Sequence, residues 1–191
     1  LGGPIMKDKL WFFGAYDPTR RTTHYGEVTG GDNPVADKTR EFDRQTDFYA
    51  AKLTYAVNPN HNLVVTAFGD PQTREGHVSK PEVDEGVQQS IDEGTTNYNF
   101  RYTGILSTAF LIEGNIGQAK QDVTTQPFGS IAASVPRQVD ETSGQYWYGG
   151  AQRLGDQKAK RDGIALKLTN YIGTHELRYG GDLERNDFDS D

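Results

Sequence analysis

Short and long connections alternate strictly along this chain of 191 residues, and this alternation limits the fold more than any other feature. The short connections contain the Asn, Asp, Gly, Pro, Ser or Thr residues that tight hairpins require. They are residues 6–9, 58–61, 107–108 and 173–174. The long connections are polar and comprise residues 17–46, 70–96 and 122–161. In an antiparallel meander, this order places every short turn at one end of the sheet and every long loop at the other.

Between these connections, apolar and polar residues alternate with the period of two that is typical of half-buried strands. In residues 163–172, for example, Ile164 and Leu166 share one face and Lys167 lies on the other. The predicted strands are residues 97–106, 110–121, 163–172 and 176–185, the weaker patterns at 48–57 and 62–70, an aromatic segment at 10–16 and a strand end at 1–5. No sustained helical pattern is present, so the sequence predicts an all-β, antiparallel up-and-down meander of about seven to eight strands.

The polar sides of these strands carry charges and amides that a soluble core would not accept. Each group costs several kcal/mol when it is buried without a partner, but little in a water-filled lumen. The residues predicted to face such a lumen are Arg101, Glu113, Lys167, Arg178 and Asp182, together with Lys52 and Asn99. Aromatic residues near strand ends fit the interfacial girdles of membrane barrels. These are Tyr55, Tyr98, Phe110 and Tyr171.

Charged inner sides and unequal connections together predict a partial transmembrane β-barrel, with short periplasmic turns and long extracellular loops. A soluble β-sandwich or a soluble up-and-down barrel remains the alternative, because those folds also alternate.

Composition excludes several other classes of protein. Hydrophobic residues make up 34% of the chain, and no apolar run approaches the roughly 20 residues of a membrane helix. Without cysteine there is no disulfide, no thiol nucleophile and no Cys-ligated metal. The net charge of −7 argues against nucleic-acid binding. Ten Tyr, nine Phe and two Trp are too many for a disordered chain.

Residues that suit catalysis are scattered, and we predict no enzyme activity, no catalytic residues and no cofactor. The four histidines form no known motif, and no phosphate-binding or nucleophile-elbow pattern is present. Glu176, Asp182 and Glu184 are carboxylates on one predicted face, but Lys167 and Arg178 balance them as lumen charges would.

Two long connections contain candidate binding residues. Residues 70–96 hold seven carboxylates against Arg74 and Lys80, but their spacing fits no calcium loop, so we predict a solvated charge run and no metal. Tyr146, Trp147 and Tyr148 are candidate ligand contacts, because exposed aromatic rings stack on sugars or pack against a lid. The alternative is that they pin the loop or begin an extracellular strand extension.

Residues 2–16 closely resemble a hairpin of TonB-dependent outer-membrane receptors: Gly-Gly-Pro-Ile, a Lys-Asp-Lys turn and an aromatic run. The nearest subgroup is the Oar-like one, whose members often begin with a carboxypeptidase-regulatory-like domain. Residues 58–63 with 68–71, and residues 173–185, resemble later turns and strands of the same barrel. The resemblance covers most strands and lapses in the three long connections.

The resemblance implies that residues 1–191 are a partial TonB-dependent receptor β-barrel domain that lacks the plug and the remaining strands of a 22-stranded barrel. Because Leu1 is not an initiator Met, we expect an excerpt of a longer chain. The implied function is active uptake of a scarce solute, such as a siderophore, glycan or peptide, through the outer membrane of a Gram-negative bacterium. The implied partners are outer-membrane lipid and a TonB-type energy-transducing protein, which acts through the plug. The alternatives are a soluble or surface-displayed β-domain that binds a partner through its loops, and a small passive outer-membrane barrel.

Overall fold

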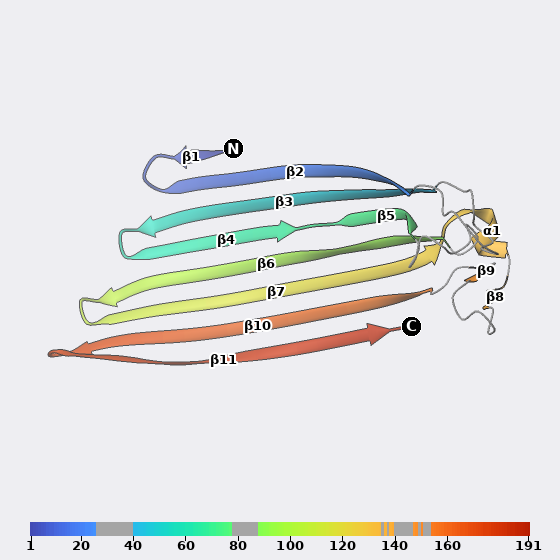
Figure 1. The fold of residues 1–191 in the computed structure, drawn as a ribbon. Coiled ribbons are helices and arrows are strands. Elements are labelled where there is room, and N and C mark those ends of the chain that lie inside the picture. Colours follow the sequence, from blue (N-terminus) through green and yellow to red (C-terminus); the bar gives the residue numbers. More distant parts are fainter. Residues whose placement is uncertain are drawn as a thin grey trace.

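The fold is a single antiparallel sheet with long strands, seen in a computed structural model that describes residues 1–25, 40–77, 88–134, 136, 138–139, 147–148, 150 and 154–191 (Figure 1). The strands are β1 (Gly2–Met6), β2 (Leu10–Tyr25), β3 (Arg40–Asn58), β4 (His61–Gly69), β5 (Gln72–His77), β6 (Gln89–Ser107), β7 (Phe110–Pro127), β10 (Gly155–Ile172) and β11 (His175–Ser190). A six-residue helix α1 (Gly129–Ser134) and a separate pair, β8 (Gln138–Val139) and β9 (Trp147–Tyr148), lie between β7 and β10.

The strand order is that of a meander, β1-β2-β3-β4-β6-β7-β10-β11, and every pair in it is antiparallel. β5 continues past the end of β4 and pairs with both β3 and β6. All eight predicted strands are present, which confirms the predicted fold class. The four short turns also lie where they were predicted. In two of them the chain adopts a positive φ, 60° at Asp8 and 61° at Gly173, a conformation that tight turns need.

The long connections were predicted too long, because the strands extend well into them. β6 begins at Gln89 rather than at residue 97, and β3 begins at Arg40 rather than at residue 48. Apart from Phe42 and Ile91, these extensions are polar or glycine on both faces, so the hydrophobic alternation that reveals a strand disappears there. Backbone pairing continues regardless, and residues 89–96 stay in register with β7.

The strands are staggered, so the short turns step progressively outward from β1–β2 to β10–β11 (Figure 1). Phe12 and Leu183 occupy one continuous row of paired residues across the sheet. β2 begins two residues from this row, at Leu10, whereas β11 begins eight residues from it, at His175. The offset between the row and the turn therefore grows by one residue from each strand to the next. A strand rises about 3.3 Å per residue, and neighbouring strands lie about 4.8 Å apart. If all the short turns lie at one level, as at the edge of a barrel, the strands are tilted by about 35° from the barrel axis. Strands of closed barrels have this tilt.

One face of the sheet, here called the apolar face, carries that row of large side chains. One residue from each of seven neighbouring strands contributes: Phe12, Leu53, Val65, Phe100, Ile116, Ile164 and Leu183. Their exposure ranges from 38% at Phe12 to 76% at Leu183, so no second layer covers them. Within the described residues, only Ile91 and Ala132 are buried hydrophobic residues. The described sheet therefore has no hydrophobic core of its own.

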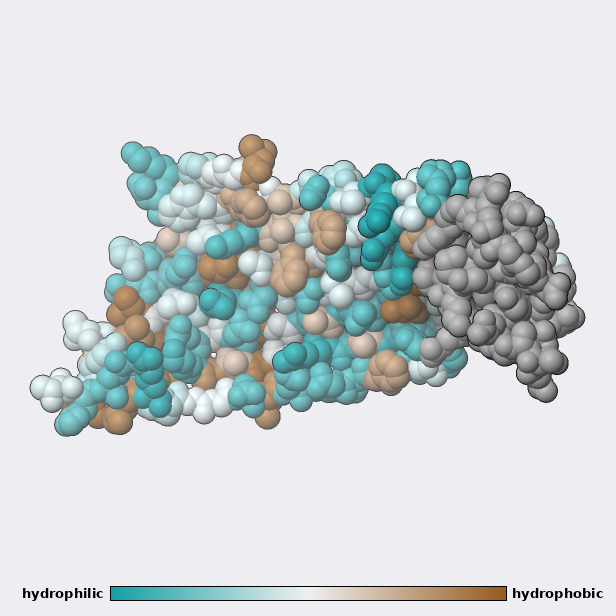
Figure 2. Space-filling model, viewed as in Figure 1, coloured by the Kyte–Doolittle hydropathy of each residue, from teal (hydrophilic) through white to brown (hydrophobic). Residues whose placement is uncertain are grey.

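Hydrophilic and hydrophobic side chains are interspersed on the face of the molecule that Figure 2 shows. No helix of the described part of the chain is long and apolar enough to cross a membrane.

Candidate functional site

The face opposite the apolar face, here called the polar face, brings together the residues that were predicted to face a lumen. Arg101 and Asp182 lie in one cross-strand row, with Asn115 and Ala165 between them. Glu113 and Lys167 are direct partners in the adjacent row. The alternation of each strand places Arg178, Lys52 and Asn99 on this face as well.

Ion pairs link neighbouring strands across the polar face. Lys167 Nζ lies 2.7 Å from Glu113 Oε2, and Arg161 pairs with Glu184. Arg178 pairs with Glu176 on the same strand. These side chains are exposed to between 36% and 64%, so their charges remain hydrated. The polar face therefore suits contact with water.

Replacement of Glu113 by glutamine in the full-length protein should change the free energy of unfolding by less than about 1 kcal/mol, because the pair with Lys167 is exposed. Equilibrium urea unfolding in lipid vesicles measures the change. A loss of about 3–5 kcal/mol would instead indicate a buried pair inside a folded core and would contradict a water-filled lumen.

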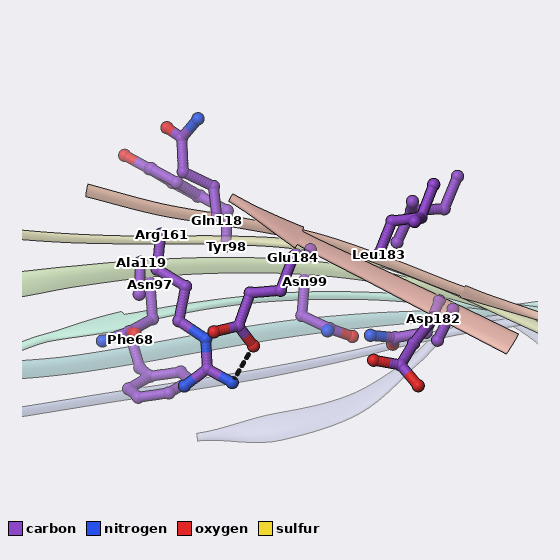
Figure 3. A pocket seen from close by; sticks show the side chains of 15 residues that line it. Phe68, Asn97, Tyr98, Asn99, Gln118, Ala119, Arg161, Asp182, Leu183 and Glu184 are labelled. Carbon is purple, nitrogen blue, oxygen red and sulfur yellow. Dashed lines mark hydrogen bonds and ion pairs between the residues drawn. The ribbon is translucent and has the colours of Figure 1, made fainter. Parts of the chain in front are cut away.

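A hollow lies on the polar face where two glycines, Gly117 and Gly163, are direct cross-strand partners. In Figure 3, Phe68, Asn97, Asn99, Arg161, Asp182 and Glu184 project to one side of the sheet, and Tyr98, Gln118 and Leu183 project to the other. Asn115 lines the hollow too, and its Oδ1 is buried without a hydrogen-bond donor. Sequence reasoning missed this hollow, because the glycines are 46 positions apart and only the strand register brings them together.

One predicted girdle residue was placed on the wrong face. Tyr55, Tyr98 and Phe110 lie on the apolar face, as expected for a girdle. Tyr171 pairs with Glu176 and shares the polar face with Lys167. The alternation in β10 already assigns Tyr171 to the polar face. Its aromatic ring and its position near a strand end were not enough to predict a girdle residue.

A polar cluster lies at the far edge of the apolar face, beyond Tyr49. Asp47 accepts hydrogen bonds from Gln45 Nε2 at 3.0 Å and Tyr16 Oη at 2.8 Å, and Arg20 Nη1 lies 3.3 Å from it. The amide of Gln45, and then the hydroxyl of Tyr16, hold the pKa of Asp47 below its usual range. The carboxylate stays ionised and marks where the apolar band ends.

The aromatic segment at 146–148 is only partly described. Trp147 and Tyr148 form β9, which pairs with Val139 and Gln138 of β8. Tyr146 lies outside the described residues. Their role as ligand contacts stays a prediction.

The acidic connection brings no metal-binding cluster together within the residues that the structure describes. Asp70 accepts a hydrogen bond from the backbone N–H of Thr95 at 2.9 Å, and Glu93 pairs with Arg74. Three further carboxylates, Glu82, Asp84 and Glu85, lie outside the described residues.

Comparison with known proteins finds a relative whose sequence aligns with nearly the whole chain. The chain is 26% identical to the TonB-dependent transporter Oar of Myxococcus xanthus over an alignment 266 positions long, which covers 99% of this chain and 25% of the relative. The chain is similar to a TonB-dependent transporter. It spans about a quarter of that relative's length. No protein-family model matches the chain, and no solved structure matches it.

Proposed function

We propose that residues 1–191 form part of the barrel wall of a TonB-dependent outer-membrane transporter of the Oar-like subgroup. The whole protein takes up a scarce solute, such as a siderophore, glycan or peptide, and is not an enzyme. A TonB-type protein energises it through a plug domain. The apolar face contacts outer-membrane lipid, and the polar face lines the lumen.

The uncovered apolar row from Phe12 to Leu183 is the observation that carries the proposal. Burial of a large apolar side chain contributes about 1.5–3 kcal/mol to stability. A sheet whose apolar face is exposed to water would lose this contribution at all seven residues of the row. Lipid supplies that burial without a second protein layer. Closure into a barrel satisfies the open edges of β1 and β11, which lipid cannot do. The tilt of about 35° fits such closure.

The test uses an antibody raised against residues 1–191 on membranes of the source cell. The native protein is run on a denaturing gel with and without boiling. We expect an outer-membrane band far above the 21.2 kDa of this segment that shifts on heating, as closed barrels do. A water-soluble band that does not shift would contradict the proposal and favour a soluble β-domain that binds a partner through its loops.

A further inference from the structure

Three arginines lie side by side on the polar face, in the extended parts of β2, β3 and β5. Arg21 is the direct cross-strand partner of Arg44, and Arg44 is the direct partner of Arg74. Direct partners have Cβ atoms about 4.5–5.5 Å apart, and like charges in such positions are destabilising. A bound anion would stabilise such a row of positive charges where neighbouring carboxylates do not neutralise it.

The described neighbours compensate only part of this charge. Arg74 pairs with Glu93, yet its Nε is buried without an acceptor. Arg44 Nε donates to the neutral amide oxygen of Gln72. Arg21 is exposed and makes no hydrogen bond or ion pair with another described residue.

The nearest other carboxylates do not reach the row. Asp43 and Glu75 lie next to Arg44 and Arg74 in the chain, and strand alternation directs them to the opposite face. Asp17 shares the polar face but lies four residues along β2 from Arg21. Among the described residues, three positive charges therefore face one negative charge, that of Glu93.

We propose that the Arg21–Arg44–Arg74 row binds a carboxylate or phosphate group of the transported solute. The inference rests on the proposed function, which makes the polar face the inner wall. Arg21 lies nine residues beyond Phe12 along β2, toward the long connections, and so at the extracellular mouth. The planar guanidinium fork matches both oxyanions through two parallel hydrogen bonds. The site would select anionic solutes as they enter.

The test is calorimetric titration of the purified full-length protein in detergent at low salt, with citrate and with inorganic phosphate as probes. We expect saturable binding that weakens as salt rises. The double variant Arg21→Gln/Arg44→Gln should weaken the binding of the bound probe about tenfold or more, because it removes two charge-assisted contacts. The variant keeps Arg74 and its pair with Glu93, which protects the fold.

The control is Arg20→Gln, which removes one positive charge next to Arg21 but on the opposite face. It should change the dissociation constant by less than about twofold, since its exposed pair with Asp47 contributes little. Failure of both probes to bind, or equal weakening of binding by the double variant and the control, would overturn the proposal. The heat-induced gel shift of the same preparation is scored separately. A shifting barrel that binds neither anion overturns this inference alone, whereas a wild-type protein without the shift overturns the proposed function too.

Discussion

Replacement of Ile164 by arginine in the full-length protein is expected to lower the free energy of unfolding in lipid vesicles by about 2–4 kcal/mol. Ile164 lies on the apolar face between its direct partners Ile116 and Leu183, and its side chain is 51% exposed in the isolated sheet. If lipid covers this face, the new guanidinium must enter hydrocarbon or distort the bilayer to reach water. Equilibrium urea unfolding, followed by tryptophan fluorescence, measures the loss.

The neighbouring residue supplies the matched control. Ala165 lies on the polar face between Asn115 and Asp182, so in the proposed barrel arginine there would enter the lumen beside a carboxylate. Ala165→Arg should change stability by less than about 1 kcal/mol. Equal losses in both variants would mean that both faces of β10 are buried alike, as in a sheet covered on both sides, and would contradict a barrel wall with one lipid-facing and one water-facing side.

The sequence predicts the fold well where hydrophobic alternation and turn chemistry agree. In residues 163–172 the apolar residues Ile164, Leu166 and Leu168 occupy alternate positions, and Gly173 provides the positive φ of the turn. Both the alternation and the turn residue are local features, so they can be recognised without knowing which strand lies alongside. In residues 89–96, by contrast, polar residues lie on both faces, and only pairing with β7 shows that a strand is present.

The candidate site is less predictable, because it depends on register between distant segments. Alternation within each strand predicts the faces on which Arg101 and Asp182 lie. It does not predict that the two residues share one cross-strand row. Arg21, Arg44 and Arg74 are 23 and 30 positions apart, and no spacing rule connects them. The turns and the apolar row set the strand register. The residues next to an arginine in the sequence therefore do not reveal which residues lie opposite it on the neighbouring strands.

Gly180 and Gly181 provide the second prediction with a large expected effect, because adjacent glycines of β11 meet very different surroundings. A Cβ at Gly180 would overlap the carbonyl oxygen of Leu166 and approach Lys167 Cα to 2.9 Å. Both are backbone atoms of β10, so no side-chain rotation relieves the overlap. Gly180→Ala must therefore separate the two strands locally, and we expect a loss of about 1–3 kcal/mol in urea unfolding.

Gly181→Ala is the control, since a Cβ at that position meets no atom within 4 Å. In the proposed barrel it would extend from the apolar face toward lipid, and removal of a strand glycine should leave stability unchanged or raise it by up to about 1 kcal/mol. Opposite signs for two adjacent substitutions would show that β11 pairs with β10 in the register seen here. Similar effects from both would contradict that register, and a one-residue slip would then exchange the faces of every side chain in β11, including Asp182 and Leu183.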